Sequence, residues 1–194
     1  MTQRGRSLSV LLLVLTGGLG VISSTQTWLH VSLTTGAEML SVAGADAVPV
    51  LAPLSLTVLA LAGVIALSGR VLRYVFAAVA LLVAAALFAV TAPIALDAPV
   101  SAVSATVTEA TGLEGAQVVE GLVAGIDATA WPVTALGLWI LLALTAVFIA
   151  ATAHRWRSGG KRFRTDTRHQ AGPVDAIESW DDLSRGSDPT STDR

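Results

Sequence analysis

Apolar and polar positions form long blocks along this chain. Four blocks contain no Asp, Glu, Lys or Arg, namely residues 7–25, 50–68, 74–96 and 133–153. At about 1.5 Å per residue, helices of this length span most or all of a hydrocarbon core roughly 30 Å thick. A backbone in lipid has to satisfy its own hydrogen bonds, and the short alternating segments of a barrel do not occur. The pattern therefore predicts an all-α membrane protein, a bundle of four transmembrane helices.

The remaining segments differ sharply in charge. The N-terminus (1–6), the tight turn (69–73) and the tail (154–194) hold all 12 Lys and Arg, whereas two larger loops (26–49 and 97–132) hold none of them and seven acids. Cytoplasmic loops are enriched in Lys and Arg. We therefore expect both termini in the cytoplasm, the acidic loops outside, and Arg70 and Arg73 in a cytoplasmic turn.

The second outer loop has a helical rhythm that is broken at Thr111-Gly112. We expect two short helices there, lying on the membrane or over the mouth of the bundle. The apolar positions that share a face are Val100, Val103 and Val107 before the break, and Val118, Leu122 and Ile126 after it.

Small residues inside the spans predict close helix contacts. They gather in "TGGLG" at residues 16–20 and recur in the next two spans. The recurring positions are Ala62, Gly63 and Ala66 in the second span, and Ala77, Ala80 and Ala84 in the third.

Two tryptophans lie where the outer loops meet their spans. Trp28 and Trp131 are typical of an interfacial aromatic belt, which is the commoner arrangement. The alternative is a small outer pocket that they form with Gln26, His30 and Pro132. The chain has no Cys, and its three His lack metal-ligand spacing, so we predict no metal, no cofactor and no catalytic residue. The absence of an ionisable residue from the middle of every span disfavours an ion-coupled pump.

The tail begins with a basic stretch, "HRWRSGGKRFR", at residues 154–164. Next to a span, such a stretch favours binding to anionic lipid, at about 1 kcal/mol per basic residue, and it does not require nucleic acid. The predicted lipid-binding patch comprises Arg155, Arg157, Lys161, Arg162 and Arg164.

Beyond Thr165 the tail becomes acidic and rich in Gly, Ser, Pro and Thr, so we expect most of it to be disordered. Residues 173–190 allow a second interpretation. A short helix there would place Trp180 and Leu183 on one side, and it would fold against a cytoplasmic protein partner.

Four motifs in order resemble the tryptophan-operon-associated membrane protein family of actinobacteria. They are "RGRSLSVLLLVLTGGLGVISSTQTW", "APLSLTVLALAGVIALSGRVLR", "TAWPVTALG" and the tail string "SWDDLSRGSDPT". The resemblance implies four spans in a bacterial plasma membrane and an association with tryptophan biosynthesis, but no established activity. It marks Gln26, Trp28, Pro53, Arg70, Arg73, Trp131, Pro132, Trp180, Asp181, Leu183, Gly186, Asp188 and Pro189.

A membrane enzyme that uses a carboxylate pair from Glu109, Glu114 and Glu120 is disfavoured, because nothing in the sequence positions a nucleophile or a metal. Two functions are favoured instead. The first is a non-enzymatic tether or regulator that binds a cytoplasmic partner through its tail, at Trp180, Asp181, Leu183, Gly186, Asp188 and Pro189. The second is a carrier, or an export accessory, for tryptophan or a related aromatic metabolite. The sequence leaves the oligomeric state open, a homo-oligomer included.

Overall fold

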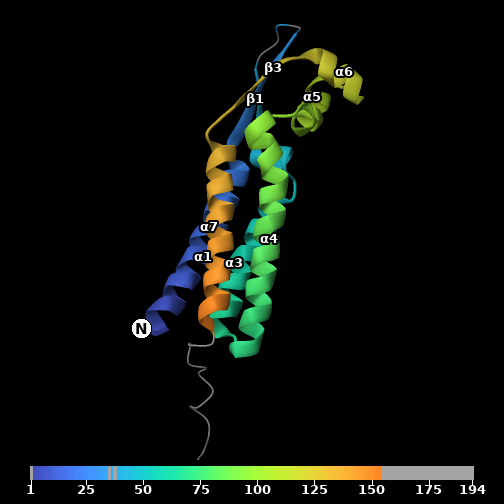
Figure 1. Cartoon of the computed structure of the whole chain (residues 1–194). Coiled ribbons are helices and arrows are strands. Elements are labelled where there is room, and N and C mark those ends of the chain that lie inside the picture. Colours follow the sequence, from blue (N-terminus) through green and yellow to red (C-terminus); the bar gives the residue numbers. More distant parts are fainter. Residues whose placement is uncertain (1, 35, 37–38, 154–194) are drawn as a thin grey trace, which may run out of the picture. The chain divides into compact units, whose positions relative to one another are not determined.

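The computed structural model describes residues 2–34, 36 and 39–153, which are mostly helical. Its long helices are α1 (Thr2–Thr25), α3 (Leu51–Leu67), α4 (Arg70–Asp97) and α7 (Trp131–Thr152), seen side by side in Figure 1. α1 packs against α3 and α7, and α4 packs against α7 and α3. Of these helices, α1, α4 and α7 are long and apolar enough to cross a membrane, whereas α3 is an apolar helix of 17 residues.

Local chemistry explains where these helices begin and end. Pro53 lies in the first turn of α3, and Pro132 lies in the first turn of α7, where a missing N–H costs little. Only Ser68 and Gly69 separate α3 from α4, so these two helices form a tight antiparallel hairpin. α4 ends where Ala98 turns into the left-handed region, with a φ of 43°.

A small antiparallel sheet lies at the other end of the helices, and it corrects the all-α prediction. β1 (Thr27–Leu33) is its central strand, flanked by β2 (Leu40–Ala43) and β3 (Val123–Ala128). The outer strands come from different loops, and β3 lies about ninety residues from β1 in the sequence. A reading of each loop by itself therefore missed the pairing.

The central strand shows the alternation expected of a sheet with one buried face. Leu29, Val31 and Leu33 are buried, whereas His30 and Ser32 between them are half-buried. Thr, Trp and Val are residues that favour strands, so β1 carries a short local signal within what was predicted to be loop.

The second loop contains the two predicted short helices, α5 (Ser104–Thr111) and α6 (Ala116–Leu122). Gly112, with a φ of 69°, ends α5 in a conformation that glycine adopts without strain. The placement of Ile126 on the face of the second helix was wrong, because α6 ends at Leu122. The backbone beyond that point pairs with β1 instead of continuing the helix.

Glycines of α1 set the distance between α1 and α3. A Cβ on Gly17 would lie 3.0 Å from the backbone N of Leu59 and 3.1 Å from the carbonyl O of Ser55. A Cβ on Gly20 would lie 2.5 Å from the Ser55 Oγ and 2.8 Å from the ring of Trp139. The close approach that the glycine motif predicts therefore occurs at these two glycines.

Other small residues of the spans divide into two groups. A Cβ on Gly18 or on Gly63 would meet no atom within 4 Å, so these glycines face open space. Five alanines were predicted at helix contacts. Four of them are buried, namely Ala62, Ala77, Ala80 and Ala84, whereas Ala66 is half-buried.

Candidate functional site

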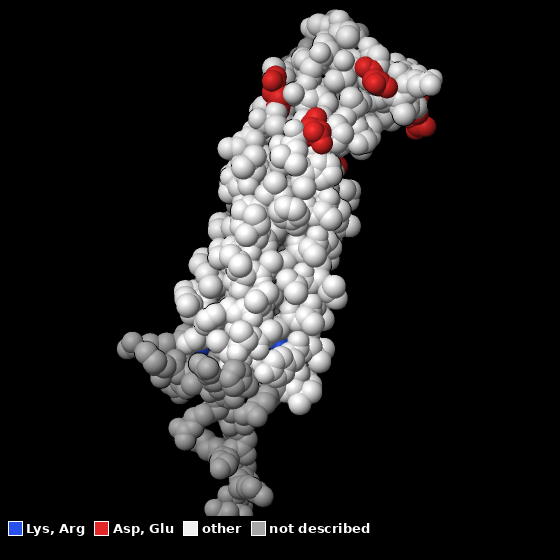
Figure 2. All heavy atoms as spheres, viewed as in Figure 1, with Lys and Arg blue, Asp and Glu red and all other residues white. Residues whose placement is uncertain are grey.

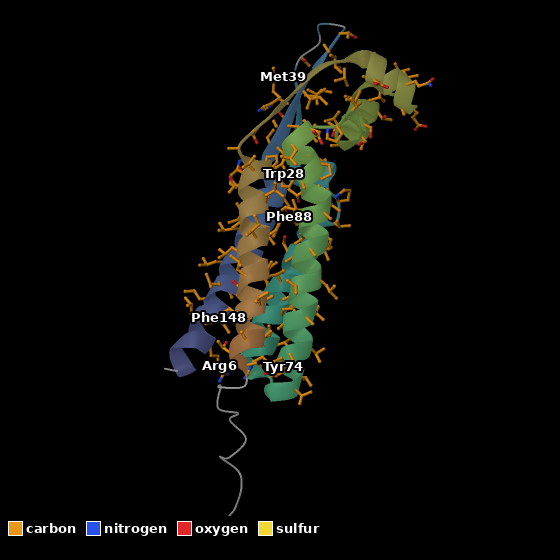
Figure 3. The ribbon with its side chains drawn as sticks, in the orientation of Figure 1. Arg6, Trp28, Met39, Tyr74, Phe88 and Phe148 are labelled. Carbon is orange, nitrogen blue, oxygen red and sulfur yellow. The ribbon has the colours of Figure 1, made fainter. Side chains whose placement is uncertain are left out.

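The predicted outer-pocket residues are held at the junction of α1, the sheet and the short helix α2 (Gly44–Ala47). Trp28 is fully buried, and its indole N–H donates to the Ser23 carbonyl O at 2.9 Å. A Cβ on Gly44 would lie 2.7 Å from that indole nitrogen. The Gly44 N–H donates to the carbonyl O of Gln26, which fixes α2 over the ring. Trp28, labelled in Figure 3, therefore offers no exposed face to a solute in this structure.

Thr129 connects this junction to the start of α7. Its backbone N–H donates to the carbonyl O of Trp28, and its hydroxyl donates to the carbonyl O of Thr27, both at 2.9 Å. The Trp131 N–H donates to the same hydroxyl at 3.3 Å. Trp131 is half-buried and Pro132 is buried, so both belong to the joint between the sheet and α7.

His30 lies farther along the sheet, in a row of polar residues. In the strand register it stands opposite Ser41 of β2 and Asp127 of β3. The His30 side chain is half-buried, while those of Ser41 and Asp127 are exposed. The structure thus brings Gln26, Trp28, Trp131 and Pro132 to one joint and places His30 among different neighbours.

Arginines gather at the opposite end of the helices, where α3 ends. Arg6 of α1 donates through Nη2 to the carbonyl O of Ala66, and Arg73 of α4 donates through Nη2 to the carbonyl O of Ser68 at 2.9 Å. The last carbonyls of a helix lack intrahelical partners and carry partial negative charge, so cations there are favourable. Sequence reasoning marked Arg73 but missed Arg6. The basic start before the first span was the signal that could have revealed it.

The two arginines differ in exposure. Arg73 is only 1% exposed, whereas Arg6 is half-buried and lines a groove of about 560 Å³ between α1 and α3. Arg70 is the first residue of α4. Arg6 is therefore a cation that reaches a cavity at this end of the helices.

Charge is divided between the two ends of the described chain. Figure 2 shows the acidic side chains at the sheet end and the basic ones at the other end, with uncharged surface between them. The described acidic residues belong to α2, the end of α4, the second loop and β3, and they are Asp46, Asp97, Glu109, Glu114, Glu120 and Asp127. Within residues 2–34, 36 and 39–153, no three His, Cys, Asp or Glu residues are grouped as metal ligands.

Two predicted sites lie outside the described residues. They are the lipid-binding patch at Arg155, Arg157, Lys161, Arg162 and Arg164, and the partner-binding tail at Trp180, Asp181, Leu183, Gly186, Asp188 and Pro189. The predicted disorder of the tail concerns the same residues.

Long apolar helices with charged residues gathered at their two ends define a transmembrane protein. The chain belongs to the tryptophan-associated transmembrane protein family, whose model matches residues 10–190. The matched range includes nearly all of the long helices, the sheet and most of the tail. No curated protein and no solved structure matches the chain.

Proposed function

We propose that this protein is a non-enzymatic membrane tether or regulator, associated with tryptophan biosynthesis, that acts through its cytoplasmic tail. It crosses the bacterial plasma membrane four times and keeps both termini in the cytoplasm. The family match carries this proposal, because it continues beyond α7 and through the tail string to residue 190. Most of the tail is thus part of the region that the family model covers.

The helix hairpin supports a fourth span. α4 is long enough to cross the membrane, and α3 returns alongside it after a connection of two residues. At about 1.5 Å per residue, the 17 residues of α3 cover roughly 25 Å, which is close to the thickness of the hydrocarbon core. The other end of α3 joins the sheet through α2, so α3 has to travel the same path as α4.

The orientation follows from charge and is tested directly by cysteine labelling, because the chain has no natural Cys. Ser41, in β2, and Gly69, between α3 and α4, are both exposed and lie at opposite ends of the helices. In intact cells, a membrane-impermeant maleimide should label Ser41→Cys, and it should label Gly69→Cys only after permeabilisation. The reverse pattern would overturn the proposed topology.

The tether proposal is tested with the full-length chain by cross-linking from the tail in cells. Trp180→Ala combined with Leu183→Ala should abolish a specific cross-linked cytoplasmic partner, because these side chains are the apolar anchors of the segment. Trp156→Ala, which removes an indole from the basic stretch, is the matched control and should leave capture unchanged. Equal capture by all three proteins would reject the tail as the binding element.

A carrier for tryptophan or a related aromatic metabolite is the alternative. The half-buried Trp131 favours it, because an indole ring stacks well on another. Labelled tryptophan should then enter proteoliposomes that contain the protein, and Trp131→Ala should reduce the rate. Flux no greater than that into empty vesicles would remove this alternative and leave the tether.

A further inference from the structure

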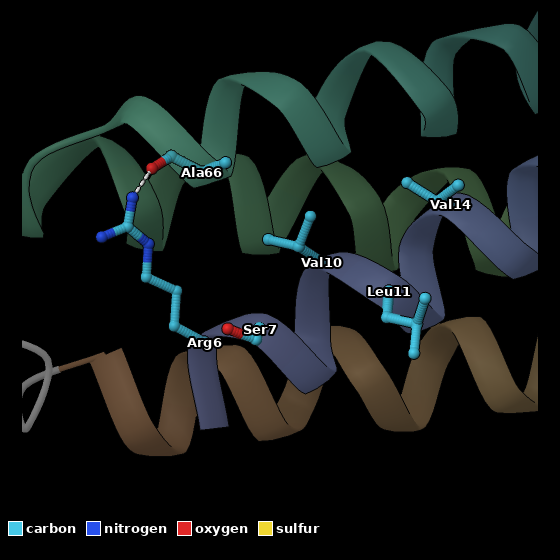
Figure 4. Close-up of a pocket in the computed structure, with 6 residues that line it drawn as sticks. All are labelled: Arg6, Ser7, Val10, Leu11, Val14 and Ala66. Atoms are coloured by element: carbon cyan, nitrogen blue, oxygen red, sulfur yellow. Dashed lines mark hydrogen bonds between the residues drawn. The ribbon is translucent and has the colours of Figure 1, made fainter. Parts of the chain in front are cut away.

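A groove with one polar end runs between α1 and α3. It has a volume of about 560 Å³ and is lined by Arg6, Ser7, Val10, Leu11, Val14 and Ala66 (Figure 4). Arg6, Val10 and Val14 follow one another at intervals of four residues, so they lie along one side of α1. The groove therefore has a cation and a hydroxyl at one end and an apolar floor along the rest of its length.

The polar end lies close to a second cation. Arg6 donates to the last turn of α3 at Ala66, and Arg73 donates to Ser68 just beyond it. Because their acceptors are only two residues apart along the end of α3, the two positively charged guanidinium groups lie near each other, and like charges repel. An anion beside Arg6 would reduce that repulsion, and because Arg73 is enclosed, Arg6 is the group that such an anion would reach.

The apolar part of the groove opens to the surface of a candidate membrane span. Leu11 is 55% exposed and Val14 is 44% exposed, and both lie within the span Gly5–Thr25. In a bilayer, acyl chains are as apolar as these side chains, so the groove alone would not select one lipid from another. Selection has to come from the charge at its end.

We propose that this groove binds one anionic phospholipid, with its phosphate beside Arg6 and an acyl chain along Val10, Leu11 and Val14. Basic pockets between membrane helices are known binding places for anionic headgroups. The inference rests on the membrane location of the chain and is independent of the role of its tail. The bound lipid would fill the space between the two helices and neutralise part of the charge at their ends.

Photo-cross-linking tests the site in full-length protein reconstituted into vesicles. The probes are photoactivatable phosphatidylglycerol and phosphatidylcholine with the reactive group on the acyl chain, and labelled peptides are mapped by mass spectrometry. We expect phosphatidylglycerol to label α1 around residues 10–14 about fivefold more than phosphatidylcholine does, as one cation near the headgroup predicts. Equal labelling by the two lipids would overturn the proposal.

Two matched pairs of variants separate charge from shape. Arg6→Gln should remove the preference for phosphatidylglycerol, whereas Arg4→Gln, which removes the same charge two residues earlier, should preserve it. Val14→Trp should fill the groove and lower labelling by both lipids, whereas Leu15→Trp, at a neighbouring position that is 46% exposed, should not. Equal effects within either pair would contradict a defined site. Thermal unfolding of both members of each pair shows whether a variant is folded. A change in labelling can then be separated from a loss of folding, because each control carries the same chemical change.

Discussion

The same two helices, α1 and α3, meet in opposite ways at their two ends. Toward the sheet, the space between them has no room for a single carbon at Gly17, whereas toward the arginines they leave a groove of about 560 Å³. The side chains of α1 differ accordingly, because Gly17 allows the two backbones to approach closely, whereas Val10 and Val14 line the groove. One helix pair thus combines a tight structural contact with a space suited to a lipid.

The largest expected effect is at the tight end. Gly17→Ala would press a methyl group against the backbone of α3, which cannot rotate away as a side chain can. We expect a loss of about 1–3 kcal/mol in the free energy of unfolding, the usual cost of overpacking. Thermal unfolding in detergent, followed by tryptophan fluorescence, measures it.

Gly18→Ala is the control for that substitution. Its methyl group would meet open space. The free energy of unfolding should therefore rise by up to about 1 kcal/mol, because alanine loses less conformational entropy than glycine when the helix forms. Opposite signs at adjacent glycines would confirm the close contact. A stabilised Gly17→Ala protein would show that α1 and α3 do not touch there.

A smaller effect is expected where α1 joins the sheet. Trp28→Phe keeps most of the buried ring but removes the N–H that donates to the Ser23 carbonyl, so a loss of about 1–2 kcal/mol is expected. Ser23→Ala removes only the hydroxyl, which lies 3.2 Å from the same nitrogen, and it should cost less. Unfolding in detergent would rank the two variants, and the reverse order would make the hydroxyl the principal acceptor.

The smallest effect on stability is expected at the open end. Arg6→Gln removes a half-buried cation from the end of α3, and helix-end charges contribute about 0.3–1 kcal/mol. In neutral detergent the change in unfolding should stay within that range. A loss as large as that expected for Gly17→Ala would mean that Arg6 holds the helices together rather than lining a lipid site.

Some predictions from sequence depended only on local patterns, and these agree with the structure. The uncharged blocks at residues 7–25, 74–96 and 133–153 correspond to α1, α4 and α7, because apolar length is sufficient to indicate a membrane helix. The break at Gly112 also separates two short helices, since glycine at that position ends a helix regardless of distant contacts.

Other features depended on segments that are far apart in the chain. Nothing local to Trp28 indicates that Gly44 covers its ring or that Thr129 bonds to its carbonyl. From its place near the end of a span, Trp28 was expected in an interfacial belt or, alternatively, in an outer pocket, whereas in the structure its ring is fully buried. The burial of the Trp28 ring depends on contacts that form only when the sheet is assembled.

The sequence by itself determined where the long helices lie and how charge is divided between their ends, because hydropathy and charge act on each segment separately. Only the tertiary structure decided that residues 27–33 pair with strands from both outer loops, which of two adjacent glycines touches α3, and that Arg6 reaches a groove. These outcomes depend on the distances between segments, and a distance between segments is a property of the packed chain rather than of any one stretch of residues.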